Sequence, residues 1–280
     1  MLKRISVIVG AFAFLYMLAR PFLVELPVKE EEKPALPKVE EKPAPPPEKP
    51  LHNVALPNFG DIKDVRMKKQ AFFSFIRPAV EEKNKEIMAQ RRQVESMLEA
   101  VSLGEPLSAE QAENLAKLAK QYRVKSSASQ LEQLHALHIK VDVIPSALVL
   151  VQAANESAWG TSRFARIGLN FFGIWCYKKG CGMVPRSRNA GANHEVQAFQ
   201  SVDEAVTRYL NNINTNNAYI MFRAIRKQLR EQEQPLIPEI LATGLLPYSE
   251  RGSDYVIELT DMLRHNQRYL DIPTISAVSP

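Results

Sequence analysis

The sequence lacks features that several large classes of protein require. Its 280 residues contain neither a Gly-x-x-x-x-Gly-Lys-Ser/Thr motif nor a Gly-x-Gly-x-x-Gly motif. Glycine motifs of this kind cradle phosphate groups, so their absence argues against a nucleotide-binding protein. Lys and Arg exceed Asp and Glu only slightly, 36 against 31, and form no dense basic stripe. A nucleic-acid partner is therefore not expected either.

Cysteine is also scarce, since Cys176 and Cys181 are the two cysteines of the chain. A zinc knuckle would need two further ligands, and none lies close to this pair in the sequence. We therefore expect no metal site and no cofactor. Two cysteines this close together favour a short disulfide-closed loop in a protein that is exported to an oxidising compartment.

A long apolar run lies at the N-terminus, where residues 5–19 carry no charge and no proline and follow Lys3 and Arg4. A positively charged start before an apolar segment predicts an export signal. No small-x-small cleavage site follows, and further apolar residues up to Leu26 bring the segment closer to the thickness of a bilayer. We therefore expect residues 1–26 to be an inner-membrane anchor and the rest of the protein to be periplasmic. A cleaved signal and a soluble periplasmic protein are the alternative.

Glycine is outnumbered by proline, 11 to 19, and ten of the prolines lie between Pro21 and Pro57. A segment so rich in Pro, Glu and Lys cannot bury a core and favours extended polyproline II structure. Residues 27–57 are therefore predicted to be a linker that holds the following domain away from the membrane. The rest of the chain is expected to comprise a helical extension (58–140), a catalytic domain (141–272) and a short tail (273–280).

Helical patterns dominate the chain after the linker. Residues 64–100 predict a charged amphipathic helix, in which Pro78 marks a break or a start. A nearly apolar helix over residues 146–157 must be buried on most of its faces. Six of the eleven glycines fall within residues 160–191, and residues 194–199 alternate as a short strand would. The sequence therefore predicts a mainly α fold with a small β-hairpin lobe.

Glu156 closes the apolar helix, just before a glycine-containing turn. A carboxyl group held at the end of a buried helix is desolvated, which raises its pKa. A carboxyl that is still protonated near neutral pH can give its proton to the leaving oxygen of a glycosidic bond. The pattern therefore indicates a general acid. The alternative is a Glu that merely caps or pairs within a crowded turn.

Residues 153–160, Ala-Ala-Asn-Glu-Ser-Ala-Trp-Gly, resemble the A-x-x-E-S-x-W-G signature of bacterial peptidoglycan N-acetylglucosaminidases, the glucosaminidase domain of flagellar-type and autolysin-type wall hydrolases. Residues 169–174 resemble the N-L-F-G-I element that follows it, residues 199–206 the start of the next helix, and residues 253–255 the closing D-x-x-Y-type element. The upstream helices and the N-terminal segment resemble more particularly the Bax-like bacterial branch of this family. The resemblance covers residues 60–272 and implies a lysozyme-like helical domain.

The resemblance also implies roles for individual residues. Glu156 matches the catalytic acid, Glu195 a second carboxylate placed across the cleft, and Tyr255 a tyrosine that faces the acid. Glu195 would activate water or stabilise a cation, with a solvated strand residue as the alternative. Tyr255 would orient the N-acetyl group or stabilise the transition state, with a core residue as the alternative. The further candidates, for substrate binding, are Gln152, Ser157, Trp159, Asn170, Phe172 and Tyr248, although aromatic residues in such places are more often core and Asn170 also suits a brace for its turn.

The resemblance thus predicts a hydrolase of peptidoglycan glycan strands that cleaves the β-1,4 bond after N-acetylglucosamine. Glu156 would protonate the leaving oxygen, and either Glu195 or the N-acetyl group of the substrate would assist the second step. The net charge of +5 suits loose attraction to an anionic wall. The alternatives are a lytic transglycosylase or muramidase-type wall enzyme, and a catalytically inactive wall-binding module.

Overall fold

The computed structural model describes residues 48–186, 188, 191 and 193–270. The chain divides into two compact units, Met1–Pro47 and Glu48–Pro280, and the described residues belong to the second. The predicted anchor (1–26), most of the predicted linker and the predicted tail (273–280) lie outside the described residues. None of the helices in the described part combines the length and the apolarity needed to cross a bilayer.

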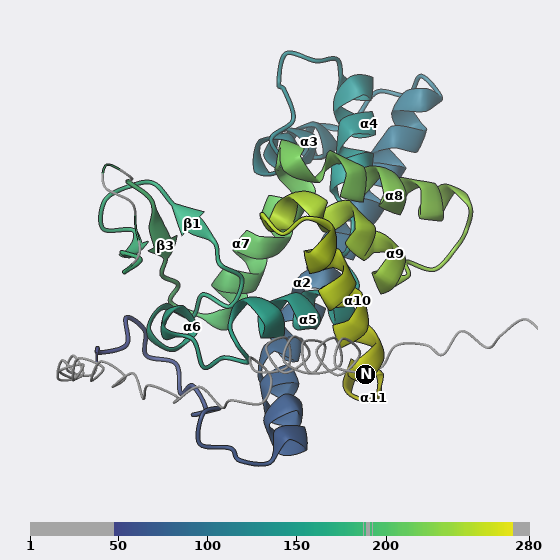
Figure 1. The fold of residues 1–280 in the computed structure, drawn as a ribbon. Coiled ribbons are helices and arrows are strands. Elements are labelled where there is room, and N and C mark those ends of the chain that lie inside the picture. Colours follow the sequence, from purple (N-terminus) through teal and green to yellow (C-terminus); the bar gives the residue numbers. More distant parts are fainter. Residues whose placement is uncertain (1–47, 187, 189–190, 192, 271–280) are drawn as a thin grey trace, which may run out of the picture. The chain divides into compact units, whose positions relative to one another are not determined.

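Helices make up most of the described unit (Figure 1). The α-helices are α2 Val65–Ser102, α3 Ala109–Gln121, α4 Gln130–Lys140, α5 Ser146–Glu156, α6 Arg163–Gly168, α7 Val202–Thr215, α8 Ile220–Glu231, α9 Pro238–Ala242, α10 Ser253–His265 and α11 Gln267–Leu270. The 3₁₀ helices are η1 Asn217–Tyr219 and η2 Thr243–Tyr248, and the strands are β1 Trp175–Cys176, β2 Gly182–Met183 and β3 Glu195–Gln197. The prediction of a mainly α protein with a small β lobe is confirmed.

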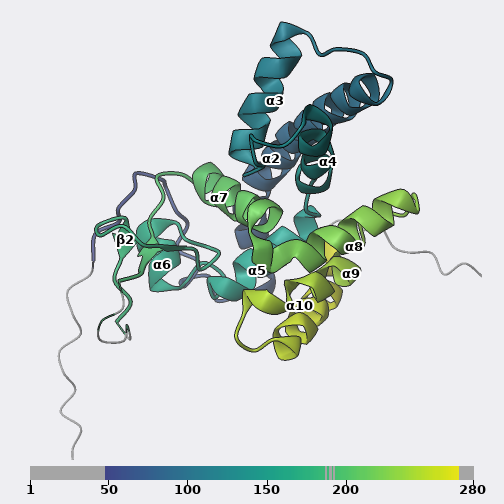
Figure 2. The ribbon, with the colours of Figure 1, turned by 90° about the horizontal axis from the view of Figure 1, so that it is seen from above.

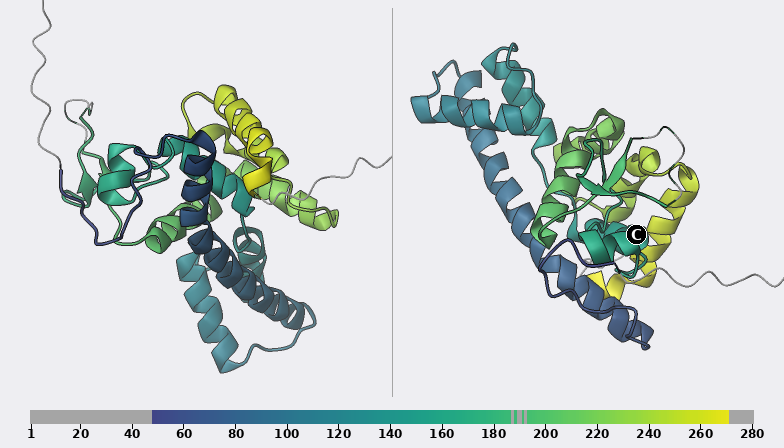
Figure 3. Two further views of the ribbon diagram at one scale, coloured as in Figure 1. Left: turned by 90° about the horizontal axis from the view of Figure 1, so that it is seen from below. Right: turned by 90° about the vertical axis from the view of Figure 1, so that its left-hand side faces the viewer.

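Helix α2 runs for 38 residues without interruption (Figure 3). Asp64 caps its start, because its carboxylate accepts a hydrogen bond from the backbone N–H of Met67 at 2.8 Å. The predicted break at Pro78 is wrong, since the helix continues through this residue. Proline lacks the N–H that would bond the carbonyl of Ser74. Buried neighbours such as Ile76 pack into the core, and this tertiary packing keeps the helix continuous.

Helix α5 is buried at the centre of the unit. Its residues 148–154 have no exposed side-chain surface, and the helix packs against α2, α9 and α10. The prediction that this apolar helix is buried on most of its faces is therefore confirmed. Each Å² of apolar surface removed from water stabilises the folded state by about 25 cal/mol, so α5 is held firmly in the core. The helix therefore gives a fixed support to the residue at its end. That residue is Glu156.

The end of the predicted linker packs on this unit. The backbone N–H of Leu51 donates to the carbonyl of Ile167 at 2.8 Å. His52 is buried, and its ring lies within hydrogen-bonding distance, 3.1 Å, of the carbonyl of Arg166. Phe59 is fully buried in the core. The chain therefore joins the folded unit several residues before the predicted linker ends.

The β lobe is a three-stranded antiparallel sheet with the strand order β1-β3-β2 (Figure 1). The sequence predicted a two-stranded hairpin, and the additional strand is β2, which pairs with the second edge of β3. Gly182 permits this pairing, because a Cβ at that position would lie 2.0 Å from the carbonyl oxygen of Val196. Residues 194–199 contain β3, as their alternation predicted, whereas β1 and β2 have two residues each and are too short to leave such a pattern in the sequence.

A buried ion cluster joins the N-terminal helices to the C-terminal ones. Helix α4 lies beside α2 (Figure 2) and also packs against α8, and Asp142, 2% exposed, follows α4. Its carboxylate lies 3.4 Å from Nη1 of Arg91 on α2 and 2.9 Å from Nη2 of Arg230 on α8. The guanidinium of Arg226, also on α8, is 1% exposed and donates to the backbone carbonyl of Asp142 at 3.0 Å. Burial alone would raise the pKa of Asp142, but the hydrogen bond from Arg230 and the other two guanidinium charges outweigh it and lower the pKa.

Candidate active site

Glu156 is followed by a tight reversal of the chain. The buried hydroxyl of Ser157 donates to the carbonyl four residues earlier at 2.6 Å and accepts from the backbone N–H of Gly160 at 2.8 Å. Residues 158–160 all adopt left-handed backbone conformations, with φ of 50°, 58° and 76°. A Cβ at position 160 would lie 2.5 Å from the ring of Phe59, so this position requires glycine. Ser157, a predicted substrate contact, is therefore buried and supports the turn from inside the protein.

The carboxyl group of Glu156 is half-buried and lines a cavity of about 1070 Å³. Burial raises the pKa of this carboxyl, the hydrogen bond from Tyr255 and the charge of Arg251 oppose the rise, and the net shift is upward. Gly173 lies beside this carboxyl, because a Cβ at position 173 would be in ordinary contact with Oε2 of Glu156, at 3.6 Å. A desolvated carboxyl beside an open cavity has the properties of a general acid.

A chain of hydrogen bonds orients the hydroxyl group that contacts Glu156. The hydroxyl of Tyr209 donates to Oε1 of Gln152, and Nε2 of Gln152 donates to the hydroxyl oxygen of Tyr255 at 2.9 Å. Because the Tyr255 oxygen accepts from Gln152, its own proton is available for the carboxylate of Glu156. Tyr209, Gln152 and Tyr255 are each at most 1% exposed. Gln152, a predicted substrate contact, is therefore a buried bridge between the two tyrosines and does not line the cavity.

Aromatic rings pack in layers beside this chain of hydrogen bonds. The ring of Tyr248 lies parallel to that of Tyr255, with centroids 5.5 Å apart, and its hydroxyl donates to the carbonyl of Phe172 at 2.7 Å. Phe172 in turn stacks on Tyr209 at 4.3 Å. Phe172 and Tyr248 line the cavity together with Glu156. Burial raises the pKa of the Tyr248 and Tyr255 hydroxyls well above the usual range, so both remain hydrogen-bond donors.

Two other predicted substrate contacts lie away from this cavity. Asn170 is buried and braces the turn before β1, because its Nδ2 donates to the carbonyls of Ile174 and Gln197, both at 2.8 Å. Trp159 packs edge-on against Phe73, with centroids 5.2 Å apart, and lines a separate groove along α10. Neither residue is brought to the carboxyl of Glu156.

Glu195 has both of its carboxylate oxygens engaged within the β lobe. Oε1 accepts from the backbone N–H of Gly180 at 3.0 Å, and Oε2 from that of Gly182 at 2.9 Å. These backbone hydrogen bonds lower the pKa of the Glu195 carboxyl. The side chain is 5% exposed and does not line the cavity. The structure therefore does not place Glu195 across the cleft from Glu156.

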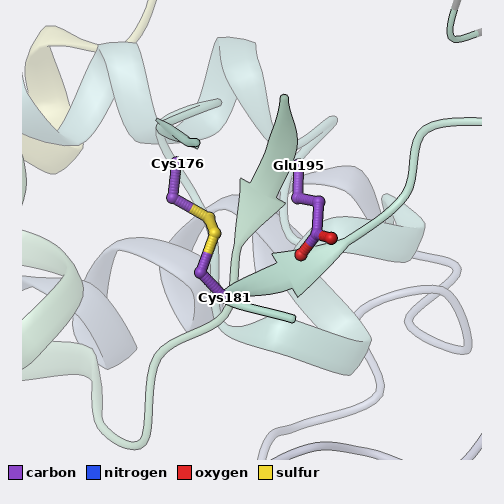
Figure 4. Close-up of side chains that lie close together, drawn as sticks. All are labelled: Cys176, Cys181 and Glu195. Atoms are coloured by element: carbon purple, nitrogen blue, oxygen red, sulfur yellow. A yellow bond between two sulfur atoms is a disulfide. The ribbon is translucent and has the colours of Figure 1, made fainter. Parts of the chain in front are cut away.

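The two cysteines form the predicted disulfide, with their Cα atoms 6.3 Å apart, beside Glu195 (Figure 4). Within the described part of the chain, Cys176, Cys181 and Glu195 are the one His/Cys/Asp/Glu group close enough together to hold a metal ion. The disulfide occupies both sulfur atoms, and the carboxylate is bonded to backbone N–H groups. This cluster is therefore a support for the loop.

Most of the residues that line the cavity were not predicted, and they include the following five. Arg123 lies in the turn between α3 and α4 with a left-handed φ of 52°, and its carbonyl accepts from Nζ of Lys140 at 3.0 Å. Arg123 lies in the predicted helical extension, far in sequence from the recognised motifs, so nothing in the sequence indicated that it lines the cavity. The aromatic residues on either side of Cys176 could have been noticed as a pair beside a disulfide. The other four residues are Trp175, Tyr177, Arg208 and Glu250.

Replacing Tyr209 with Phe is expected to lower kcat about tenfold with little change in KM. The substitution removes the donor that fixes the Gln152 amide, so Tyr255 loses its defined orientation toward Glu156. Leaving Oε1 of Gln152 unpaired should also lower stability by about 1–3 kcal/mol. The matched control is Tyr122→Phe, which removes another buried tyrosine hydroxyl, bonded to Gln90 at 2.7 Å, from a residue that does not line the cavity. Steady-state kinetics that show equal loss in both variants would contradict this role.

The sequence of this chain matches a known class of protein. A family profile described as "Mannosyl-glycoprotein endo-beta-N-acetylglucosaminidase" matches residues 131–268. The chain belongs to this glucosaminidase family. It is also 34% identical over 217 residues to "Protein bax" of Escherichia coli (strain K12), which covers 77% of this chain and 76% of that protein. No solved structure matches the chain.

Proposed function

We propose that this protein hydrolyses the β-1,4 bond after N-acetylglucosamine in peptidoglycan glycan strands, with Glu156 as the general acid. The observation that carries the proposal is a carboxyl of raised pKa that lines a cavity of about 1070 Å³ and is hydrogen-bonded by Tyr255. The family description supports the bond type, because it names an endo-acting N-acetylglucosaminidase. Glu156 would protonate the glycosidic oxygen as the bond to the anomeric carbon breaks.

The N-acetyl group of the substrate is proposed to assist the second step. Glu195 is held by two backbone N–H groups inside the β lobe, which leaves it poorly placed to activate water. Glu250 is the other carboxylate that lines the cavity within the described residues, and it is exposed. An internal nucleophile would attack the anomeric carbon from the face opposite Glu156, and water would then release the product. Two displacements retain the configuration of the sugar, whereas a single attack by water inverts it.

The charge of the cavity supports an anionic polymer as substrate. Arg123, Arg208 and Arg251 line it, against the two carboxyl groups of Glu156 and Glu250. In the described part of the chain, neither Arg123 nor Arg208 forms an ion pair, and Arg208 donates from Nε to Oε1 of Gln197 at 3.4 Å, which leaves its two terminal nitrogens. Their guanidinium groups are therefore available to carboxylates of the peptides that peptidoglycan strands carry.

Analysis of the products formed from purified peptidoglycan tests the proposal. Mass spectrometry should find new N-acetylglucosamine reducing ends, and proton NMR taken early in the reaction should find the β anomer in excess. Anhydro-muramyl ends would instead identify a lytic transglycosylase. Binding to peptidoglycan without any new ends, by a folded protein, would identify a wall-binding module.

We also propose that residues 1–26 anchor the protein in the inner membrane and that the catalytic unit acts in the periplasm. The support comes from the sequence, where Lys3 and Arg4 precede an apolar run, and from the disulfide, which suits an oxidising compartment. Cell fractionation tests this, since an anchored protein stays with the membranes after alkaline washing. A shortened protein in the soluble periplasmic fraction would show a cleaved signal.

A further inference from the structure

Two large aromatic side chains are exposed on one wall of the cavity. Trp175 is 50% exposed and Tyr177 is 74% exposed, and both line the same cavity as Glu156. Neighbouring exposed aromatic surface marks a place where a protein contacts something else. Trp175 begins β1 and Tyr177 directly follows the end of this strand, so the two rings flank Cys176 at the start of the β lobe.

The ring of Trp175 has a defined orientation. It stacks on the ring of His194, with centroids 4.2 Å apart and an angle of 10° between the planes. This contact covers one face of the indole, and the exposed half of the side chain is turned to the cavity and solvent. A rigid aromatic side chain offers contact area at a low cost in conformational entropy. Sugar rings present flat C–H faces, which pack well on such a surface.

Two independent sets of interactions, a disulfide bond and the hydrogen bonds of Glu195, hold the loop that carries Tyr177. The disulfide joins Cys176, immediately before Tyr177, to Cys181. The carboxylate of Glu195 lies beside the disulfide (Figure 4). It accepts hydrogen bonds from the backbone N–H groups of Gly180 at 3.0 Å and Gly182 at 2.9 Å, on either side of Cys181 in the sequence. A loop fixed in this way loses little entropy when a ligand binds.

The distance from the acid identifies which part of a ligand this wall could contact. Gly173 lies beside the carboxyl of Glu156. A fully extended chain advances about 3.3 Å per residue. The Cα atom of Trp175 therefore lies at most about 7 Å from that of Gly173, and the Cα atom of Tyr177 at most about 13 Å from it. Both rings line the cavity on this side of Glu156, and Tyr177 is the farther of the two along the chain, so a polymer cut at Glu156 could reach Tyr177 with a sugar unit beyond those joined by the scissile bond.

We propose that Trp175 and Tyr177 form a sugar-stacking subsite for a distal ring of the glycan strand, and that the disulfide and Glu195 hold this subsite in place. The inference rests on the proposed function, because the strand that enters the cavity is the occupant. It gives Glu195 a role in positioning the loop. It also makes the enzyme selective for long strands over short ones.

Binding measurements in a Glu156→Gln background test the subsite without cleavage. The probes are peptide-free oligosaccharides of alternating N-acetylglucosamine and N-acetylmuramic acid, one long and one too short to reach the loop. The chain has two tryptophans, so adding Trp159→Phe leaves Trp175 as the fluorescent reporter. Its emission should change with the long probe and stay constant with the short one. An unchanged spectrum at saturation with the long probe would overturn the proposal.

Substitutions then measure the contribution of each ring. Trp175→Ala and Tyr177→Ala should each weaken binding of the long oligosaccharide about tenfold and leave binding of the short one unchanged. The control is Val184→Ala in the same lobe, a residue that is 46% exposed and does not line the cavity. Tyr177 is so exposed that its loss should not disturb folding. Unchanged affinity in Tyr177→Ala, or a loss that appears only when peptides are attached to the glycan, would contradict the proposal.

Enzyme kinetics test whether the disulfide and the hydrogen bonds of Glu195 hold the subsite in place, in variants whose catalytic residues are wild-type. Cys176→Ser with Cys181→Ser, and separately Glu195→Gln, should raise KM for long strands several-fold and leave kcat on short substrates near the wild-type value. Glutamine at 195 places an NH₂ group opposite a backbone N–H, which breaks one of the two hydrogen bonds. A loss of kcat on short substrates in Glu195→Gln would indicate that Glu195 takes part in catalysis, and it would overturn the inference. Failure of the wild type to cleave any glycan would instead refute the proposed function, while the binding titrations would still decide on the subsite.

Discussion

Replacing Glu156 with Gln is expected to lower kcat on peptidoglycan by about 10²–10⁴-fold, the usual contribution of a positioned general acid. Glutamine keeps the shape of the side chain and can still accept a hydrogen bond from Tyr255, but it has no acidic proton for the leaving oxygen. KM should change little, because the walls of the cavity are intact. The measurement is the rate at which new reducing ends form. A variant that keeps activity within a few-fold of the wild type would exclude Glu156 as the acid.

The same substitution should stabilise the protein at neutral pH. Burial raises the pKa of Glu156 above the value of about 4.5 expected in the unfolded chain. A raised carboxyl pKa favours folding fully below the unfolded value, and this contribution is lost as the pH rises through the folded value. Above that range, ionisation favours the unfolded chain, and a neutral amide removes this effect. The melting temperature of the variant should therefore exceed that of the wild type by a few degrees at about pH 7, and the difference should vanish at about pH 4.

Glu250→Gln is the matched control for both measurements. Glu250 lines the same cavity but is exposed, so its substitution relieves no buried charge and should leave the melting temperature unchanged. If removing any carboxylate from the cavity raised the melting temperature, both variants would show the rise. A loss of kcat in Glu250→Gln as large as that in Glu156→Gln would count against a single general acid.

The parts of this protein that could be predicted from its sequence are local. Glu156 stands out because a single carboxylate closes an apolar helix, and the serine and glycine that follow are required by the turn itself. The helix starts are also local, since Ser108 and Ser129 each form a reciprocal capping box with the residue three positions later. Signals of this kind span fewer than about ten residues, so a single sequence contains them in full.

The parts that could not be predicted depend on distant residues that meet only in the fold. Tyr209 lies 57 positions from Gln152, and nothing in either segment indicates their hydrogen bond. Glu195 was given a catalytic role because its position matches a carboxylate of the family motif. The sequence does not reveal the two backbone N–H groups that hold this carboxylate in the fold. Arg123 reaches the cleft from outside the residues that the family profile matches. Residues near an active site are therefore easier to list from a sequence than to assign to roles.

Asp142→Asn is expected to destabilise the protein by about 3–5 kcal/mol, the usual effect of removing one partner from a buried ion cluster. The amide has nearly the same shape, so the loss is one of charge. Arg226 is 1% exposed and Arg91 is 6% exposed, and neither can move its guanidinium into water without unfolding its surroundings. Urea unfolding followed by circular dichroism should show a midpoint lowered by about 1–2 M. Because the pKa of Asp142 is lowered, its contribution is present above about pH 3.8 and is lost as the pH falls below that value, where the two proteins should converge.

The control for this prediction is Asp261→Asn, which removes an exposed partner of Arg264 at 3.8 Å and should change stability by no more than about 0.5 kcal/mol. The shape of the Asp142→Asn transition is also informative, because this residue lies at the predicted boundary between the extension (58–140) and the catalytic domain (141–272). Its partners are on α2 and on α8, so the cluster ties the two parts together. We therefore expect one transition that shifts as a whole. Two separate transitions in the variant would mean that the extension folds independently and that Asp142 merely docks it to the catalytic helices.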